Sequence, residues 1–294
     1  MLQRVSATEN TRSFLEYGRP AAVVLADDGK LGRGPYSKLQ NAGVSPLVVS
    51  RNAVKQSLNF DPLAVDTAAI AGQDPARSGI IIGGFTPGSV QGALDKLGGT
   101  KVSSGSTTQW RFRDDDTFGI DDPLGKAIPD VVSKLDLVAL DGNSLRYASS
   151  SSTLDITDAS AKTSLAADPS IAAIAKCLAD PLAVLLVKSE KSTANREIGI
   201  GESGAKGTTP VETLCIATAS DTEAKTTMTE LQSRLAGDTT TSTKQRWSEL
   251  LTNVKVVVLG GAGHIVELTA NPTSGNAGVL FNAAVRNDLA ALME

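Results

Sequence analysis

LDLVALDGNSLRYA, at residues 135–148, is the most informative stretch of this sequence. Two short apolar runs, at residues 135–140 and 145–149, flank the pair Asp141-Gly142. An Asp-Gly pair between two such runs favours a β-hairpin with a two-residue turn. The stretch therefore predicts two antiparallel strands that are adjacent in the sheet.

A second hairpin is expected in the second half of the chain. The sequence NVKVVVLGG, at residues 253–261, has its apolar positions and its turn glycine at places that match KLDLVALDG. It predicts strands at residues 254–259 and 264–270. Other short apolar runs bounded by turn residues predict further strands, at residues 65–71, 79–84, 101–113, 182–187, 197–200 and 211–219.

Amphipathic helices are expected between these strands. Thr86 and Pro87 are typical of an N-cap and of the first helical position. The run from Ser220 to Glu223 has the spacing of a capping box. Apolar residues then recur three and four positions apart, as on one face of a helix. The expected helices lie at residues 20–26, 86–97, 170–178, 220–237 with an extension at 244–251, and 277–292.

Both halves of the chain therefore follow the order strand, helix, hairpin, helix. This order predicts an α+β fold with antiparallel sheets, helices packed on one face, and two ferredoxin-like halves. The expected division is an N-terminal helical segment at 1–60, a first α+β half at 61–178 and a second at 179–294. Identity between the halves is weak, so chance similarity of alternating strands is the alternative to a true repeat.

The composition excludes several function classes. Hydrophobic residues make up 41% of the chain, which is enough to build a core. The net charge of −4 and the absence of a Lys/Arg-rich run argue against a nucleic-acid partner. No stretch reaches the roughly 18 apolar residues of a membrane-spanning helix.

The sequence also predicts a location. Residues 1–10 are polar and lack the apolar core of a signal peptide. Either the protein is cytoplasmic or a signal has been removed, and a polar start that leads directly into foldable sequence favours removal. A surface rich in Ser, Thr, Ala and Gly is common in exported proteins of high-GC bacteria. We therefore expect an extracellular or cell-surface protein, attached to a membrane only if a lipid anchor precedes this sequence.

Cys177 and Cys215 are the only cysteines. They fit one disulfide or two separate buried thiols. Cys177 stands at the edge of the apolar face of the helix at 170–178, and Cys215 stands in the middle of a strand. A helix edge over a strand can bring the Cα atoms within the roughly 4.4–6.8 Å that a disulfide needs. A Cys177–Cys215 disulfide is expected, and export would supply the oxidising compartment.

The glycine-rich segments do not match cofactor-binding motifs. The sequence GESGAKGT, at residues 201–208, has Lys206 and Gly207 in the reverse of the order that a phosphate-binding loop needs. It precedes Pro210 and a strand, whereas that loop opens a helix. The GGAG segment at residues 260–263 lacks the third glycine of a dinucleotide fingerprint and is expected to be a turn. We expect no bound cofactor.

The sequence indicates no catalytic residue and no metal ligand. His264 is the only histidine, so any histidine-based acid–base chemistry must use it. No Gly-x-Ser-x-Gly segment stands between a strand and a helix. The acidic connection at residues 113–129 lacks the ligand spacing of a calcium loop and is expected to be a surface loop. Trp110 and Trp247 are expected to anchor cores.

Several short motifs spread over most of the chain carry a family resemblance. They are FLEYG at 14–18, IIIGGF at 80–85, KCL at 176–178, the strand that contains Cys215, WSELL at 247–251 and GGAGH at 260–264. On these motifs the chain resembles uncharacterised exported or lipid-anchored proteins of actinobacteria. The family has no known activity, so the resemblance implies a location and no functional residue.

Two hypotheses of different class follow. The first is a non-enzymatic binding or structural protein of the bacterial surface, because no nucleophile–base pair, metal cluster or cofactor loop is seen. The second is a hydrolase with an atypical site of Asp, Glu or Ser around His264. A deep pocket of titratable groups at His264 would favour the enzyme, and a flat or apolar groove between the halves would favour binding. The sequence identifies neither a ligand nor a partner.

Overall fold

The computed structural model describes residues 1–131, 133–188, 196–261 and 263–293. The chain forms two compact units. The first unit comprises Met1–Thr11, Leu15–Ala22 and Gln40–Ser164, and the second comprises Arg12–Phe14, Val23–Leu39 and Leu165–Glu294. The chain therefore passes from one unit to the other more than once before residue 40.

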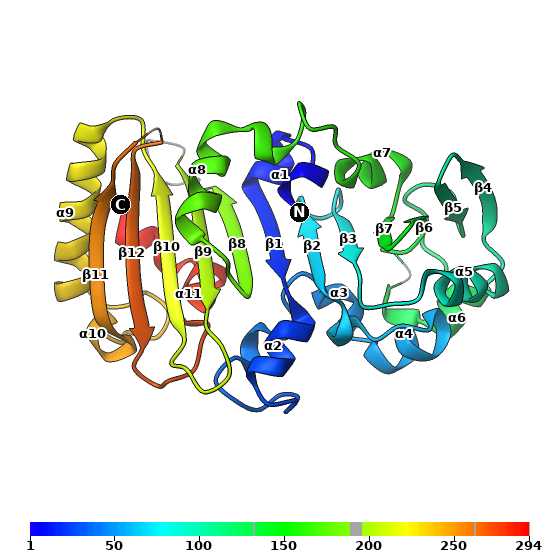
Figure 1. Ribbon diagram of the computed structural model, residues 1–294, viewed down its shortest axis with the longest axis horizontal. Coiled ribbons are helices and arrows are strands. Elements are labelled where there is room, and N and C mark those ends of the chain that lie inside the picture. The colour runs from blue at the N-terminus through cyan, green and yellow to red at the C-terminus, as the bar shows by residue number, and fades with distance from the viewer. Residues whose placement is uncertain (132, 189–195, 262, 294) are drawn as a thin grey trace. The chain divides into compact units, whose positions relative to one another are not determined.

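The first unit contains an antiparallel sheet that has seven strands within the described residues (Figure 1). Their order is β1-β2-β3-β7-β6-β5-β4, so a three-stranded meander is followed by a four-stranded one. The predicted hairpin at residues 135–148 is present as β6 and β7. The strands are β1 Phe14–Gly18, β2 Thr67–Ala71, β3 Ser78–Ile82, β4 Thr100–Ser104, β5 Thr107–Arg111, β6 Leu137–Asp141 and β7 Ser144–Ala148.

The second unit contains five antiparallel strands in its described part, in the order β8-β9-β10-β12-β11. The second predicted hairpin is present as β11 and β12. The strands are β8 Ala183–Lys188, β9 Glu197–Ser203, β10 Val211–Ala217, β11 Leu251–Leu259 and β12 Ile265–Pro272.

The two units share one strand order. In each, three consecutive strands form a meander, a helix follows, and a hairpin returns so that its second strand pairs with the third strand of the meander. The first unit adds the β4–β5 hairpin outside β6. A ferredoxin-like unit has a helix after its first strand, whereas in the second unit β8, β9 and β10 all precede α9, so the ferredoxin-like description is not confirmed. In addition, β1 lies within residues 1–60, the segment expected to be helical.

Within the described residues, all α-helices but three have eight residues or fewer. Those that begin before residue 165 are α1 Glu9–Ser13, α2 Pro20–Ala26, α3 Ser45–Val48, α4 Arg51–Leu58, α5 Pro87–Lys96, α6 Pro123–Ala127 and α7 Ser151–Leu154. The later ones are α8 Pro169–Leu178, α9 Asp221–Gly237, α10 Trp247–Leu250, α11 Val279–Val285 and α12 Asp288–Met293. The helix expected at 277–292 is divided in two, and Asn287, at a φ of 61°, marks the break.

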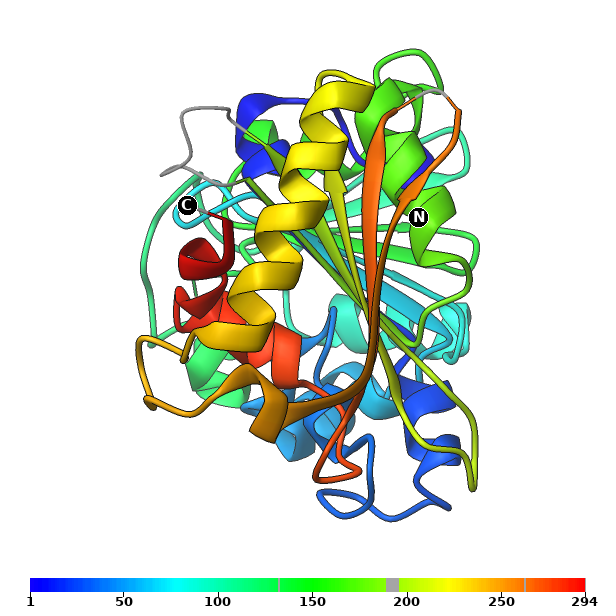
Figure 2. The ribbon, with the colours of Figure 1, turned by 90° about the vertical axis from the view of Figure 1, so that its left-hand side faces the viewer.

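Helices cover both faces of the second unit's sheet, which corrects the prediction of helices on one face. Gly199 and Gly201 of β9 face α8, because a Cβ atom on either would meet side chains of that helix. The alternate residues Ile198 and Ile200 belong instead to the core shared with α9, α11 and α12. Figure 2 shows α8 on one side of these strands and α9 on the other.

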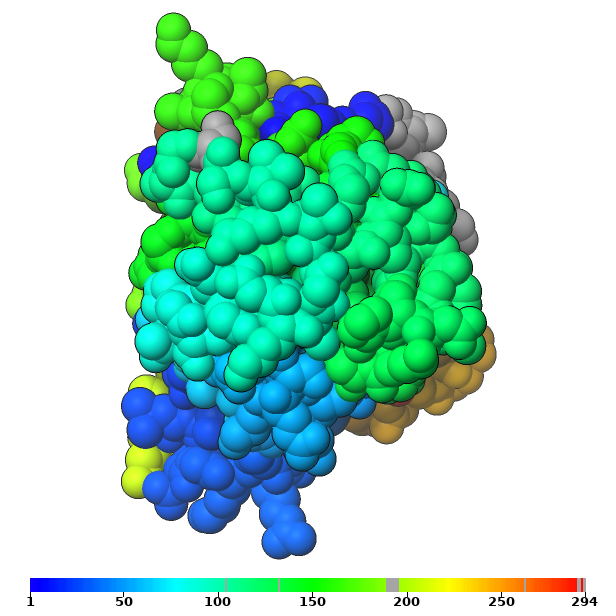
Figure 3. Space-filling view, turned by 90° about the vertical axis from the view of Figure 1, so that its right-hand side faces the viewer, coloured from blue at the N-terminus to red at the C-terminus, as the bar shows by residue number. Residues whose placement is uncertain are grey.

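The acidic connection at residues 113–129 is only partly a surface loop. Residues 114–118 are exposed, and Figure 3 shows this part of the chain, in teal to green, at the surface. However, the connection also contains α6, whose Leu124 is buried, and Arg113 and Ile128 are buried as well. Apolar residues inside the connection therefore hold it against the unit.

One negative finding concerns membranes. Across the part of the chain that the structure describes, no helix combines the length and the apolar character needed to cross a bilayer.

Candidate functional site

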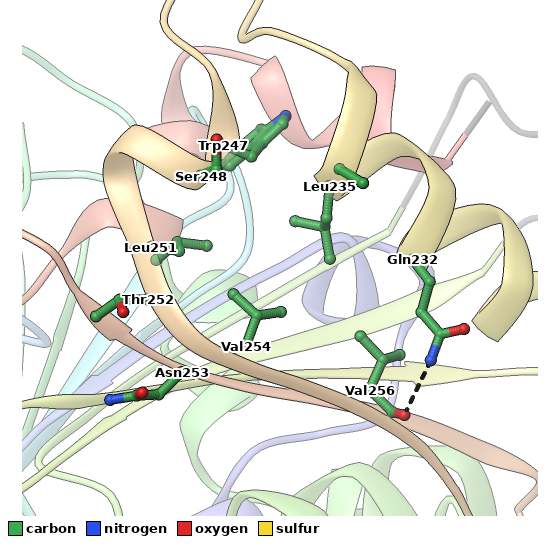
Figure 4. Close-up of a pocket in the computed structure, with 10 residues that line it drawn as sticks. Gln232, Leu235, Trp247, Ser248, Leu251, Thr252, Asn253, Val254 and Val256 are labelled. Atoms are coloured by element: carbon green, nitrogen blue, oxygen red, sulfur yellow. Dashed lines mark hydrogen bonds between the residues drawn. The ribbon is translucent and has the colours of Figure 1, made fainter.

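A cavity of about 340 Å³ lies in the second unit between α9, α10 and the first half of β11 (Figure 4). This volume is at the lower end of the range for small-molecule pockets. None of the side chains that line the cavity is charged. They are Gln232, Leu235, Ala236, Trp247, Ser248, Leu251, Thr252, Asn253, Val254 and Val256.

Helix α9 forms the first wall. The helix begins where expected, because the Oγ of Ser220 accepts a hydrogen bond from the backbone N–H of Glu223 at 3.2 Å. Leu231 and Leu235 are buried in the core and fix which face of the helix turns inward. Gln232 then lies at the cavity, where its Nε2 donates to the backbone oxygen of Val256 at 3.5 Å.

Helix α10 places Trp247 in the second wall. This tryptophan is 1% exposed and belongs to the core of the second unit, as the sequence predicted. Its indole N–H has no hydrogen-bond partner among the described residues, although a buried indole N–H usually finds one. The neighbouring Ser248 adds a hydroxyl to the lining. The wall therefore combines an aromatic ring with the hydroxyl of Ser248.

Strand β11 forms the third wall, at the outer edge of the second unit's strand order. Its pairing with β12 changes register between Thr252 and Lys255. Within this bulge Asn253 adopts a φ of 53°, and its Nδ2 donates to the Oδ1 of Asn271 at 3.1 Å. Bulges redirect side chains, and Val254 is left 41% exposed at the cavity.

This lining is suited to binding. Apolar side chains contribute by removing ligand surface from water, and the hydroxyls and amides of Ser248, Thr252, Gln232 and Asn253 can orient a ligand. The lining offers no acid–base pair, no activated nucleophile and no cluster of metal-ligating side chains. The cavity can therefore select a neutral, mainly apolar molecule.

His264, the predicted candidate for acid–base chemistry, lies elsewhere in the second unit. Its Nδ1 is 2.7 Å from the Oδ1 of Asp221, the first residue of α9. An Asp–His pair orients the imidazole ring. However, no Ser or Thr hydroxyl within the described residues hydrogen-bonds to the ring, and both cysteines form a disulfide. The hydrolase hypothesis stays a prediction.

The two cysteines form the disulfide that the sequence predicted. Cys177 on α8 is bonded to Cys215 on β10, with the Cα atoms 6.3 Å apart. The alternative of two separate thiols is therefore wrong. The start of α8 is fixed separately, because Asp168 accepts a hydrogen bond from the backbone N–H of Ser170 at 3.0 Å.

The segment at 201–208 is only partly the expected loop, because Gly201, Glu202 and Ser203 extend β9, and the connection to β10 begins after them. Lys206, which in a phosphate-binding loop would contact phosphate, lies 2.5 Å from the Oδ1 of Asp28. The hydroxyl of Thr208 is 3.1 Å from that of Tyr36. These contacts tie the connection to the segment Val23–Leu39 of the same unit.

Two buried glutamates lie beside this connection. Glu202 accepts a hydrogen bond from the backbone N–H of Gly278, and Glu212 accepts from those of Val279 and Leu280. Burial, and then the neighbouring Glu212 carboxylate, raises the pKa of Glu202 well above its ordinary value. This pair could not be predicted from the sequence, because Glu202 was part of an apparent loop motif.

The aspartates of the acidic connection are used in separate contacts. Asp115 pairs with Arg111 at 2.6 Å, and Asp122 pairs with Arg113. Among the residues that the structure describes, no three His, Cys, Asp or Glu side chains are placed to hold a metal ion.

The sequence analysis named Trp247 and the motif WSELL at 247–251 but predicted no cavity there. For the other lining residues the sequence carries only a weak signal. Asn253 precedes Val254 in an otherwise regular strand, and the bulge lies at this position. Comparison of the chain with family models, curated proteins and solved structures gives no match.

Proposed function

We propose that this is a non-enzymatic binding protein whose second unit holds a small, neutral, mainly apolar ligand between α9 and β11. The observation that carries the proposal is the uncharged cavity of about 340 Å³ beside buried Trp247.

The walls favour entry of a ligand from solvent. Val254 is partly exposed at the bulge, and Ala236 on α9 is exposed. The deeper residues, Leu235, Leu251 and Val256, are buried and apolar. A ligand would therefore leave water progressively as it passes between the helix and the strand, which is favourable for an apolar body.

Tryptophan fluorescence tests the proposal. The only other tryptophan, Trp110, is in the first unit, so the Trp110→Phe variant leaves Trp247 as the sole emitter. We expect N-phenyl-1-naphthylamine, a neutral apolar dye that accepts energy from tryptophan, to quench Trp247 emission in a saturable way. The same titration of the unaltered chain shows whether the variant itself changes binding.

Two variants of α9 locate the dye. Ala236→Phe puts a ring into the cavity and is expected to weaken dye binding about tenfold or more, because the added volume competes with the dye. Ser233→Phe adds the same ring at an exposed position that does not line the cavity, and binding should be unchanged. Equal binding by all of these proteins, or no saturable quenching, would contradict the proposal.

We further propose that the protein works outside the cytoplasm, as an exported or lipid-anchored protein of the actinobacterial type. The Cys177–Cys215 disulfide supports an oxidising compartment. Mass measurement after alkylation of the unreduced protein, taken directly from cells, tests this. Two alkylated cysteines would contradict it.

A further inference from the structure

A second cavity, of about 330 Å³, lies in the first unit where β6 begins and β7 ends. Asp136 directly precedes β6 and Ser149 directly follows β7, and the paired residues Leu137 and Ala148 hold these ends together. Asp116 and Phe118 of the acidic connection complete this side of the lining. The cavity is separate from the one beside Trp247.

Asp136 is the unusual member of this lining. It is 0% exposed, and its Oδ1 accepts a hydrogen bond from Nη1 of Arg113 at 2.6 Å. Its other oxygen, Oδ2, has no partner among the described residues. Buried carboxylate oxygens without a donor are costly and rare. The unused oxygen therefore points to a donor supplied from outside the chain.

Arg113 cannot turn to satisfy that oxygen. Its side chain is 6% exposed, and its Nη2 donates to the Oδ1 of Asp122 at 2.8 Å. Asp122 is itself fixed, because the same oxygen accepts from the backbone N–H of Gly125 at the start of α6. The guanidinium thus forms a rigid support behind Asp136.

The remaining lining is acidic with an aromatic ring. Asp116 accepts a hydrogen bond from the hydroxyl of Ser149 at 2.8 Å, and its backbone N–H donates to the Ser149 carbonyl. Asp74 lies 3.4 Å from Lys134. Asp74 also pairs with Arg77, and Asp136 pairs with Arg113, so Asp116 is the one lining carboxylate without an ion pair among the described residues. The ring of Phe118 is 73% exposed, which is unusual for a phenylalanine.

We infer that this cavity binds an organic ammonium ion that carries a short apolar or aromatic body. The ammonium donates to Oδ2 of Asp136 and is further neutralised by Asp116, and the body packs on Phe118. The Asp116 carboxylate, together with the unused oxygen of Asp136, favours a cation over a neutral ligand. A bare metal ion fits less well, because no three metal-ligating side chains come together within the described residues.

Calorimetry with simple amines tests the inference. We expect benzylamine to bind to the unaltered protein, and benzyl alcohol, which has the same body without the charge, to bind about tenfold more weakly or worse. Undetectable binding of benzylamine at millimolar concentration overturns the inference. So does equal binding of the alcohol.

Matched variants place the amine. Asp116→Asn and Phe118→Ala are expected to weaken benzylamine binding severalfold, whereas Asp114→Asn and Ile120→Ala, exposed positions of the same connection that do not line the cavity, should not. Asp136→Asn should weaken it most. If that variant fails to fold, the two exposed lining positions still decide. The inference is overturned if neither Asp116→Asn nor Phe118→Ala weakens benzylamine binding. It is also overturned if the two control variants weaken binding by the same amount.

Discussion

Gly199 determines how closely α8 can approach the sheet of the second unit. It pairs with Cys215 across β9 and β10, and a Cβ atom at this position would lie 2.2 Å from Cγ2 of Ile174. Gly199→Ala should therefore destabilise the protein by about 1–3 kcal/mol through overpacking. Chemical denaturation at equilibrium measures the change.

Gly92 is the matched control for this substitution. It lies in α5, where an added Cβ would meet nothing within 4 Å. Gly92→Ala should leave stability unchanged or raise it by up to about 1 kcal/mol, because alanine favours the helix. A Gly199→Ala variant as stable as Gly92→Ala would show that α8 can move away from β9.

Glu202 should make stability depend on pH. Its pKa is raised in the folded state by burial and by the Glu212 carboxylate, so the folded protein favours the protonated form. The contribution to stability is complete below the ordinary glutamate pKa and is lost as the pH rises through the folded value. We expect Glu202→Gln to flatten the fall in unfolding free energy with rising pH, as measured by denaturation at a series of pH values.

An exposed glutamate separates this effect from general charge. Glu230→Gln on α9 makes the same chemical change at the surface. Its unfolding free energy should depend on pH as that of the unaltered protein does. If Glu202→Gln and Glu230→Gln show the same pH dependence, the buried carboxyl of Glu202 is not the group that causes the fall in stability.

Among the elements, α8 and β10 are joined covalently. The Cys177–Cys215 disulfide closes a segment of 38 residues, and the chain-entropy model assigns such a loop about 4 kcal/mol. The double variant Cys177→Ala, Cys215→Ala should lose roughly that amount in denaturant unfolding, less any cost of strain. Reductant should destabilise the unaltered protein and leave the variant unaffected; a loss below about 1 kcal/mol would contradict the model.

The sequence predicted elements better than their arrangement. The hairpins of β6–β7 and β11–β12, the capped helix α9 and the disulfide depend on local signals, such as Asp141-Gly142 and Ser220, which a sequence displays directly. The helices on both faces could not be seen, because β9 presents glycines rather than large apolar residues to α8. Gly199 and Gly201 mark the face that α8 covers.

The candidate sites were harder still to predict. The cavity beside Trp247 depends on a bulge at Asn253, and the cavity at Asp136 depends on Arg113, which lies 23 positions away in the chain. Asp136 stands among the apolar residues of a strand signal, where an isolated acidic residue gives no pattern. Both sites are created by contacts between elements, so no spacing in the sequence encodes them.

At the scale of the whole molecule, the chain order does not follow the division into units. Val23–Leu39 lies in sequence inside the first unit but belongs to the second. The boundaries predicted at residues 60 and 178 assume that each half is continuous in sequence. No local signal in the sequence shows that Val23–Leu39 belongs to the second unit. A consequence is that the second unit depends on residues far from it in sequence.

We therefore expect the fragment 165–294 to fold poorly by itself. Tyr36 is fully buried, its hydroxyl is 3.1 Å from that of Thr208, and the backbone N–H of Ala277 donates to the Pro35 carbonyl at 2.7 Å. Loss of a buried aromatic residue costs about 3–5 kcal/mol, a large part of a typical folding free energy of about 5–15 kcal/mol.

Near-ultraviolet circular dichroism and thermal unfolding of the fragment 165–294 measure the effect. A synthetic peptide of residues 12–39 should restore a cooperative transition, whereas the same peptide with Tyr36→Ala should not. A fragment that unfolds at the same temperature with or without the peptide would show that the second unit is autonomous.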